Sequence, residues 1–230
     1  MKNKKHGFGI HAFSDDARKT FDEIVANEEK IDDLIYWVES ESIVVISGPK
    51  NSGKTRMALE VIEEFRGEGK VIYVDLDTYN KELDIGHLLV GNQSFFRKVT
   101  NKMPDYMILI VDNAHSLDND FYRRLQYYFD QNYLRSVVLI KKTGADLKLP
   151  DSMMSRIGNK VINLSPLSKE EAVEIMFERL EGFIAEAQLE KIWMLSKDFE
   201  NFLENCEKVV IESEEEDKDI DNKFIEKVLK

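Results

Sequence analysis

Residues 48–55 read Gly48-Pro49-Lys50-Asn51-Ser52-Gly53-Lys54-Thr55, which is the G-x-x-x-x-G-K-T pattern of a phosphate-binding loop, or P-loop. The apolar run Ile43–Ile46 precedes this loop, and a helical pattern of apolar residues that reaches Phe65 follows it. Glycines let the backbone curve so that its N–H groups point at phosphate oxygens, and the helix adds its positive end. The stretch therefore predicts a nucleoside triphosphate site.

Lys54, Thr55 and Asp112 are the residues that we expect to carry the chemistry. The Lys54 ammonium would reach the β- and γ-phosphates, and the Thr55 hydroxyl would ligate Mg²⁺. Asp112 ends the apolar run Met107–Val111, and a carboxylate at this edge of a parallel sheet can hold Mg²⁺, usually through water. The predicted metal residues are Thr55 and Asp112. The predicted nucleotide-binding residues are Gly48, Pro49, Lys50, Asn51, Ser52, Gly53, Lys54, Thr55 and Arg56.

Five short apolar runs predict strands, at residues 43–46, 71–74, 107–111, 137–140 and 161–164. The run at 107–111 has no polar interruption, which is typical of a strand that is buried on both faces of a parallel sheet. Helical patterns separate the runs, one of them from about residue 83 to residue 99. Strands that alternate with helices predict a parallel α/β sheet.

The pattern changes at Ser165-Pro166, and from there to Lys230 the sequence predicts helices only. Ser168 and Glu171 have the spacing of a helix capping box. The acidic run at 212–219 is interpreted as a solvated linker before a last short helix. We therefore predict two domains, a nucleotide-binding α/β core at 1–164 and a helical domain at 165–230.

Composition limits the partners and the compartment. The chain has 230 residues and a net charge of −12, so we expect nucleic-acid contact only indirectly or through a local basic patch. Nucleotides and protein surfaces, including further copies of the chain, are the expected partners. Cys206 is the single cysteine, which favours a reducing compartment. We find neither a signal peptide nor an apolar run long enough to span a membrane, so a cytoplasmic location is expected.

In this order, the motifs resemble the AAA+ ATPases, and within them the branch of origin-recognition initiators and of secretion- and transposition-associated ATPases. The resemblance rests on the P-loop, on Met107–His115, on Lys142 and Thr143 at a strand end, on Arg156 before the last strand, and on the helical tail. The segments Phe8–Phe13 and Ser165–Ser168 also fit that branch. The resemblance implies a five-stranded P-loop core, a C-terminal helical lid, and ATP with Mg²⁺ as cofactors.

The resemblance also implies roles for individual residues. Asp112 matches the Walker B aspartate, and Lys142 or Thr143 falls where a polar side chain senses the γ-phosphate. Arg156 falls where the family has an arginine finger that acts on a neighbouring subunit's nucleotide. From the residues alone, Lys142 is equally well a solvated strand end, and Arg156 equally well a surface arginine at a helix end. His115 is interpreted as structural.

Two positions depart from the family pattern. Asn113 stands where the family usually has a glutamate that polarises the attacking water, and an amide cannot accept a proton at neutral pH. Where the family often has an arginine in the lid, this chain reads Ser196-Lys197-Asp198-Phe199-Glu200. The winged helix that follows the lid in replication initiators is also missing from the pattern. Nucleotide binding is therefore expected, with hydrolysis by Lys54, Asp112, Asn113, Lys142 and Arg156 at a low rate.

The expected function is that of an ATP–Mg²⁺ switch that acts on a protein or protein–DNA assembly. The alternative is a non-hydrolysing scaffold or adaptor that nucleotide stabilises. A small-molecule kinase is disfavoured, because such enzymes usually place several lid arginines near the phosphates and the helical tail offers only Arg179.

Overall fold

The computed structural model describes residues 12–13, 27–68, 70–79, 83–91 and 104–230. The chain divides into two compact units, one of which is Glu29–Ser165, while the other combines Pro166–Lys230 with the N-terminal residues. Most of the predicted segment Phe8–Phe13 and the second half of the helix predicted at 83–99 lie outside the described residues. Within the described part, no helix is both long and apolar enough to cross a bilayer.

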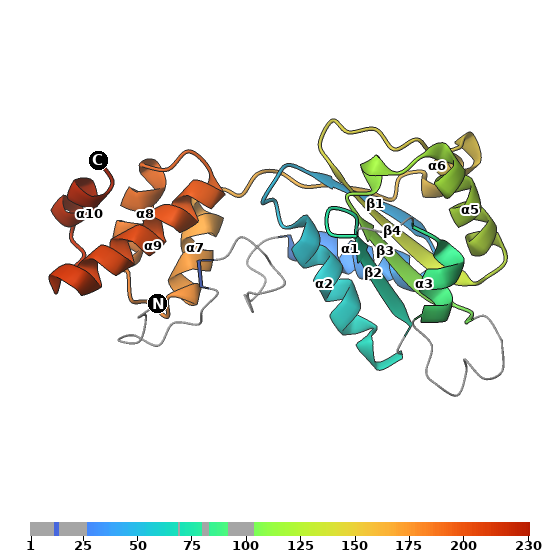
Figure 1. Ribbon diagram of the computed structural model, residues 1–230, viewed down its shortest axis with the longest axis horizontal. Helices are drawn as coiled ribbons and strands as arrows, with labels where there is room; N and C mark the ends of the chain where they lie inside the picture. Colours follow the sequence, from blue (N-terminus) through green and yellow to red (C-terminus); the bar gives the residue numbers. More distant parts are fainter. Residues whose placement is uncertain (1–11, 14–26, 69, 80–82, 92–103) are drawn as a thin grey trace. The chain divides into compact units, whose positions relative to one another are not determined.

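The α/β unit contains a five-stranded sheet in which every neighbouring pair of strands is parallel (Figure 1). The strand order is β2-β3-β4-β1-β5. The bounds are β1 (Ile43–Gly48), β2 (Val71–Asp75), β3 (Met107–Asp112), β4 (Leu134–Lys142) and β5 (Val161–Asn163). The predicted parallel α/β sheet is thus confirmed. Its order places β3 between β2 and β4, so that the carboxyl ends of β2 and β3 are neighbours.

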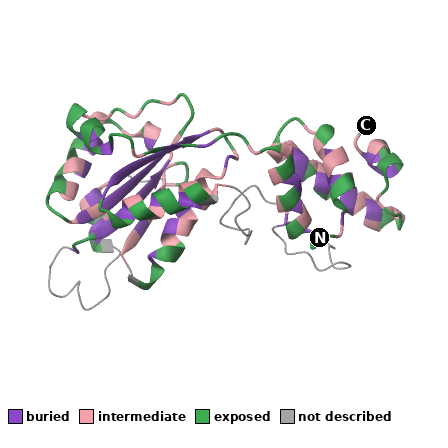
Figure 2. Ribbon diagram, turned by 180° about the vertical axis from the view of Figure 1, so that it is seen from behind, coloured by how far each residue is buried: buried purple, intermediate pink, exposed green. Residues whose placement is uncertain are grey.

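Helices cover both faces of this sheet, and the strands are its most buried part (Figure 2). All residues of β1 and β3 are buried, which confirms the prediction made for the uninterrupted apolar run at 107–111. One face packs against α3 (Ile85–Gly91), α5 (Asn119–Asp130) and α6 (Asp151–Ile157) in a single apolar core. The other face is covered by α1 (Glu28–Glu39) and α2 (Lys54–Glu64). Two 3₁₀ turns, η1 (Arg66–Glu68) and η2 (Ala114–Ser116), follow α2 and β3.

The helical unit consists of four described helices around a second core. They are α7 (Lys169–Arg179), α8 (Glu186–Met194), α9 (Phe199–Glu216) and α10 (Asn222–Val228). The predicted capping box at the start of α7 is confirmed, since Ser168 and Glu171 each accept the other's backbone N–H. Ala12, which the sequence analysis assigned to the α/β part, is buried in this second core. Cys206 is also buried there, and burial raises the pKa of its thiol.

The interpretation of residues 212–219 as a linker is wrong, because α9 continues to Glu216. Apolar residues of α9 remain buried up to Val210, and Ser213 continues that buried side. The helix then ends on Asp217 in a left-handed conformation, with the Ser213 hydroxyl donating to the carbonyl of Lys218 at 2.6 Å. Lysine ammonium groups from 218 and 227 donate to the Glu216 carboxylate, which offsets repulsion within the acidic run.

Candidate nucleotide site

The P-loop connects the end of β1 to the start of α2, and its shape depends on two glycines. Gly53 has a φ of 86°, a left-handed conformation that favours glycine. At Gly48, an added Cβ would lie 2.4 Å from the Ser52 hydroxyl oxygen and 2.9 Å from Cβ of Leu164. The Ser52 hydroxyl itself donates to the carbonyl of Pro49 at 2.9 Å and holds the loop closed. Helix α2 thus begins directly after a compact loop, and a helix N-terminus after such a loop is a common anion-binding arrangement.

Lys54 lies in the first turn of α2, where its ammonium donates to the Pro49 carbonyl. Burial lowers the pKa of Lys54; the Asp112 carboxylate opposes this shift and the nearby Lys142 adds to it. The ammonium groups of Lys54 and Lys142 and the N-terminus of α2 therefore lie near the carboxylate of Asp112. A polyphosphate would be attracted to this positive potential and would in turn favour the charged form of Lys54.

Asp112 is the buried acceptor at the centre of the site. It is 5% exposed, and its Oδ2 accepts hydrogen bonds from the Thr55 hydroxyl at 2.9 Å and from the Tyr73 hydroxyl at 3.0 Å. Its Oδ1 accepts from the backbone N–H of Asn113 at 2.8 Å. The structure therefore brings together Thr55 and Asp112, which are 57 positions apart in the chain. No role was predicted for Tyr73, because its position in a short apolar run carries no functional signal.

Asn113 follows Asp112 in a left-handed conformation, with a φ of 58°. Asparagine tolerates this region better than most residues, because its short polar side chain can bond locally. Here the Nδ2 group donates to Oδ1 of Asp75 at 3.2 Å. Asp75 ends β2 and is paired in register with Asp112. Two carboxylates and one amide thus meet at the ends of two neighbouring strands.

Lys142 and Thr143 follow the neighbouring end of β4. Lys142 is paired in register with Gly48, and the backbone N–H of Thr143 donates to the Gly48 carbonyl at 3.1 Å. Both side chains are exposed. The predicted phosphate-sensing position therefore lies directly beside the first residue of the P-loop.

The remaining predicted residues have other partners. Arg156 is on α6, where its guanidinium forms an ion pair with Asp130 of α5 and lies 5.8 Å from the ring centre of Phe129. Arg56 pairs with Glu60 one turn along α2, at 2.7 Å. Within the loop, Lys50 is exposed and Asn51 has a φ of 59°. Among the described contacts of the α/β unit, Arg156 thus belongs to the α5–α6 surface rather than to the P-loop.

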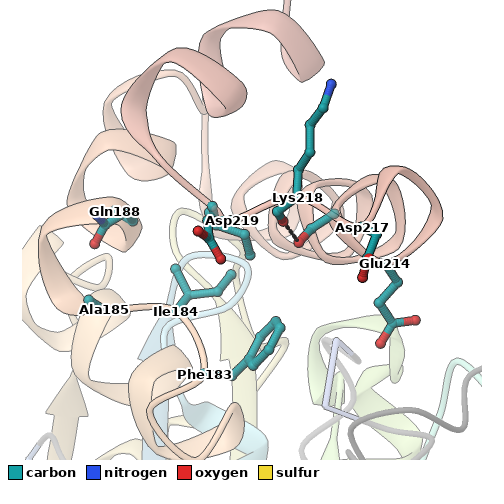
Figure 3. Close-up of a pocket in the computed structure, with 10 residues that line it drawn as sticks. Phe183, Ile184, Ala185, Gln188, Glu214, Asp217, Lys218 and Asp219 are labelled. Atoms are coloured by element: carbon teal, nitrogen blue, oxygen red, sulfur yellow. Dashed lines mark hydrogen bonds between the residues drawn. The ribbon is translucent and has the colours of Figure 1, made fainter.

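In the helical unit, the stretch that departs from the family pattern starts a helix. Asp198 caps α9 by accepting the backbone N–H of Asn201 at 2.9 Å, and Lys197 is exposed next to it. The unit also has a cavity of about 390 Å³, which Figure 3 shows between the start of α8 and the α9–α10 connection. Its lining includes Phe183, Ile184, Gln188 and Asp219, none of which the sequence analysis placed in a site.

Comparison with known proteins shows the family to which the chain belongs. The sequence model of an AAA domain matches residues 40–173, which is more than half of the chain and includes β1, the P-loop and β3. The chain belongs to this AAA domain family. The AAA+ resemblance is thereby confirmed, and a nucleotide-binding domain of the ATPase type follows from it. No curated protein sequence matches the chain.

Solved structures share the fold of this AAA domain at low sequence identity. Cdc6p from Pyrobaculum aerophilum has a TM-score of 0.69 at 14% identity, over 92% of this chain and 68% of that one. The Orc1 protein of Aeropyrum pernix, solved in complex with DNA, has a TM-score of 0.70 at 14% identity, over 95% and 68%. Domain III of the replication initiation protein DnaA from Thermotoga maritima has 0.61 at 17%, over 97% and 99%. The predicted P-loop core and helical C-terminal region are both confirmed.

Proposed function

We propose that this AAA domain binds ATP with Mg²⁺ and hydrolyses it slowly, as a switch for a larger assembly. The observation that carries the proposal is the hydrogen bond of 2.9 Å between the Thr55 hydroxyl and the Asp112 carboxylate, next to a P-loop whose Gly48 leaves no room for a Cβ. Lys54 would bind the β- and γ-phosphates, and the loop's backbone N–H groups would bind the remaining phosphate oxygens. Adenine is favoured by the family alone.

The oxygen ligands of this site fit Mg²⁺. A hydroxyl and a carboxylate are hard oxygen donors, and Mg²⁺ is usually bound by one or two carboxylates, substrate phosphates and water. The described residues contain no group of three or more His, Cys, Asp or Glu side chains that could hold a metal alone. Thr55 and Asp112 would therefore hold the ion jointly with the nucleotide, and the ion would neutralise phosphate charge.

A low rate of hydrolysis is proposed because residue 113 is an asparagine. Its amide can orient a water but cannot take a proton from it, and loss of a general base typically costs about 10²–10⁴-fold in rate. The γ-phosphate would then act mainly by selecting one of two conformations of a protein-binding surface, with Lys142 or Thr143 as its sensor.

The assembly on which the switch acts is proposed to be a protein or a protein–DNA complex in the cytoplasm. The structural likeness to a DNA-bound Orc1 protein and to domain III of the replication initiation protein DnaA supports this choice, and the net charge of −12 favours contact with nucleic acid through a partner. In a homo-oligomer, Arg156 would reach a neighbour's nucleotide only after exchanging its ion pair with Asp130 for the phosphate.

Phosphate release under single-turnover conditions tests this function. The 230-residue protein in excess is mixed with ATP labelled at the γ-phosphate, with and without Mg²⁺. We expect ATP to be bound and phosphate to appear slowly, and only with Mg²⁺. Rapid turnover by the isolated wild-type protein would contradict the role given to Asn113.

The same experiment separates the switch from its alternative, a nucleotide-stabilised scaffold or adaptor. The asparagine at residue 113 favours that alternative. ATP that is retained without any phosphate release, also at high protein concentration or with DNA added, would select the scaffold.

A further inference from the structure

A carboxylate lies beside the position at which this chain departs from the family pattern. Asp75 ends β2, in register with Asp112 on the neighbouring strand. Its Oδ1 accepts a hydrogen bond from Nδ2 of Asn113 at 3.2 Å. A carboxylate is therefore one hydrogen bond away from residue 113, although it comes from another strand and from a position 38 residues earlier.

The backbone turn at Asn113 is held by two side-chain hydrogen bonds. The buried hydroxyl of Tyr122 donates a hydrogen bond to the Ala114 carbonyl at 2.6 Å, and the hydroxyl of Ser116 donates one to the Asn113 carbonyl at 2.9 Å. With Nδ2 already donating to Asp75, the amide can offer a water its Oδ1 and one further hydrogen. These groups orient a water but do not remove its proton.

The Asp75 carboxylate also accepts a hydrogen bond from the turn that directly follows β2. Its Oδ1 accepts the backbone N–H of Asp77 at 3.1 Å, in addition to the amide of Asn113. Two donors, one from the turn after β2 and one from the residue after β3, therefore hold the Asp75 carboxylate at the edge of the sheet where Asp112 also lies. Groups held by several bonds in this way are suited to act on a reacting water without rearrangement.

We propose that Asp75 is the proton acceptor for the slow ATP hydrolysis of this chain, where it replaces in part the glutamate missing at residue 113; the inference rests on the proposed function. The oxygen of a water attacks the γ-phosphorus, the bond from that phosphorus to the β–γ bridging oxygen breaks, and ADP leaves with the electron pair. The proton that the water loses passes to the Asp75 carboxylate, while Asn113 orients the water. Asp75 at the end of β2 thus accepts the proton, while Asn113 just after β3 orients the water.

The direct test replaces Asp75 by asparagine, which keeps the shape and removes the charge. Single-turnover phosphate release and the Kd for ATP are measured on the same preparation of the 230-residue protein. We expect Asp75→Asn to slow phosphate release by at least about 10²-fold, the usual value of a general base, with an unchanged Kd. Asp105→Asn is the matched control, because Asp105 is an exposed aspartate that precedes the other end of β3.

An exchange variant distinguishes chemistry from a structural role. Asp75→Asn combined with Asn113→Asp moves the carboxylate across the same hydrogen bond and keeps an amide–carboxylate pair. Aspartate also tolerates the left-handed conformation of residue 113. We expect the double variant to release phosphate at least about tenfold faster than Asp75→Asn alone, since part of the general-base contribution returns.

The outcomes separate this inference from the function on which it rests. If Asp75→Asn releases phosphate at the wild-type rate, or if the double variant is no faster than Asp75→Asn, the role of Asp75 is overturned while ATP binding stands. Tight ATP binding without phosphate release by the wild type would also overturn it. Failure of the wild type to bind ATP would overturn the proposed function itself.

Discussion

The P-loop and the joined ends of β2 and β3 are two regions of one candidate site, but they are built differently. The P-loop is a single run of eight residues whose conformation follows from Gly48 and Gly53. The strand ends bring together Tyr73, Asp75 and Asp112 by sheet register and side-chain hydrogen bonds. Phosphate binding is thus a local property of the sequence, whereas the proposed hydrolytic chemistry depends on tertiary structure.

The largest effect is expected from removing the P-loop ammonium. Lys54→Ala should weaken ATP binding by about 10- to 100-fold, because a hydrogen bond to a charged group contributes about 1.5–3 kcal/mol. Titration with a fluorescent ATP analogue measures the Kd. Lys148→Ala, which removes an exposed lysine from the loop before α6, should leave the Kd unchanged. Equal affinities of the wild type, Lys54→Ala and Lys148→Ala would contradict ATP binding by the P-loop.

The next effect tests whether the local conformation of the loop depends on Gly48. Gly48→Ala should lower the free energy of unfolding of the α/β unit by about 1–3 kcal/mol, because the new Cβ overlaps the side chains of Ser52 and Leu164. Trp37 fluorescence during urea unfolding, in a Trp193→Phe background, reports on this unit alone.

Gly67→Ala is the matched control for this substitution, since nothing lies within 4 Å of a Cβ built there. Equal loss of stability in the two alanine variants would contradict the close packing of the P-loop.

The strand-end region is tested by Tyr73→Phe, which removes one donor from Asp112 and leaves the ring in place. Partners that orient a metal-ligating carboxylate are typically worth about 10- to 100-fold in metal affinity. We expect the Mg²⁺ concentration for half-maximal phosphate release to rise about tenfold, with little change in nucleotide affinity without Mg²⁺. An unchanged Mg²⁺ dependence would mean that Tyr73 has only a structural role.

The smallest effect is expected far from the site in sequence, in the helical unit. Hydrogen bonds from Lys218 and Lys227 lower the pKa of the Glu216 carboxyl from its ordinary 4.5 to about 2. The ionised form is therefore favoured by folding, so its contribution to stability is present above pH 4.5 and is lost as the pH falls through about 2.

Glu216→Gln should thus give a slightly less stable protein at neutral pH and a difference that vanishes toward pH 2. Trp193 fluorescence in a Trp37→Phe background would follow it. Glu215→Gln, at an exposed neighbour, should show no such dependence on pH. The same pH profile for both variants would contradict the ion pairs.

The contrast between the two regions also explains what could be predicted from the sequence. The P-loop, its flanking strand and helix, and the buried strand ending at Asp112 are continuous segments, so residue types and spacing sufficed. Tyr73 and Asp75 gain their place only when β2 pairs with β3, and a short apolar run does not reveal its neighbour in the sheet.

Two further features could not be predicted from the sequence for the same reason. The acidic run was interpreted from charge alone, but the buried side of α9 and the lysines at 218 and 227 keep it helical. The role expected for Arg156 came from its position before the last strand, and that position does not reveal its ion pair with Asp130 at the end of α5. In both cases a contact from elsewhere in the fold determines the local structure.

The most direct test of the central claim is a calorimetric titration of ATP into the folded wild-type protein in the presence of Mg²⁺. We expect saturable binding of one ATP per chain, and a strongly reduced affinity for ATP in Lys54→Ala. Absence of any binding by folded wild-type protein, or equal binding by Lys54→Ala, would contradict it.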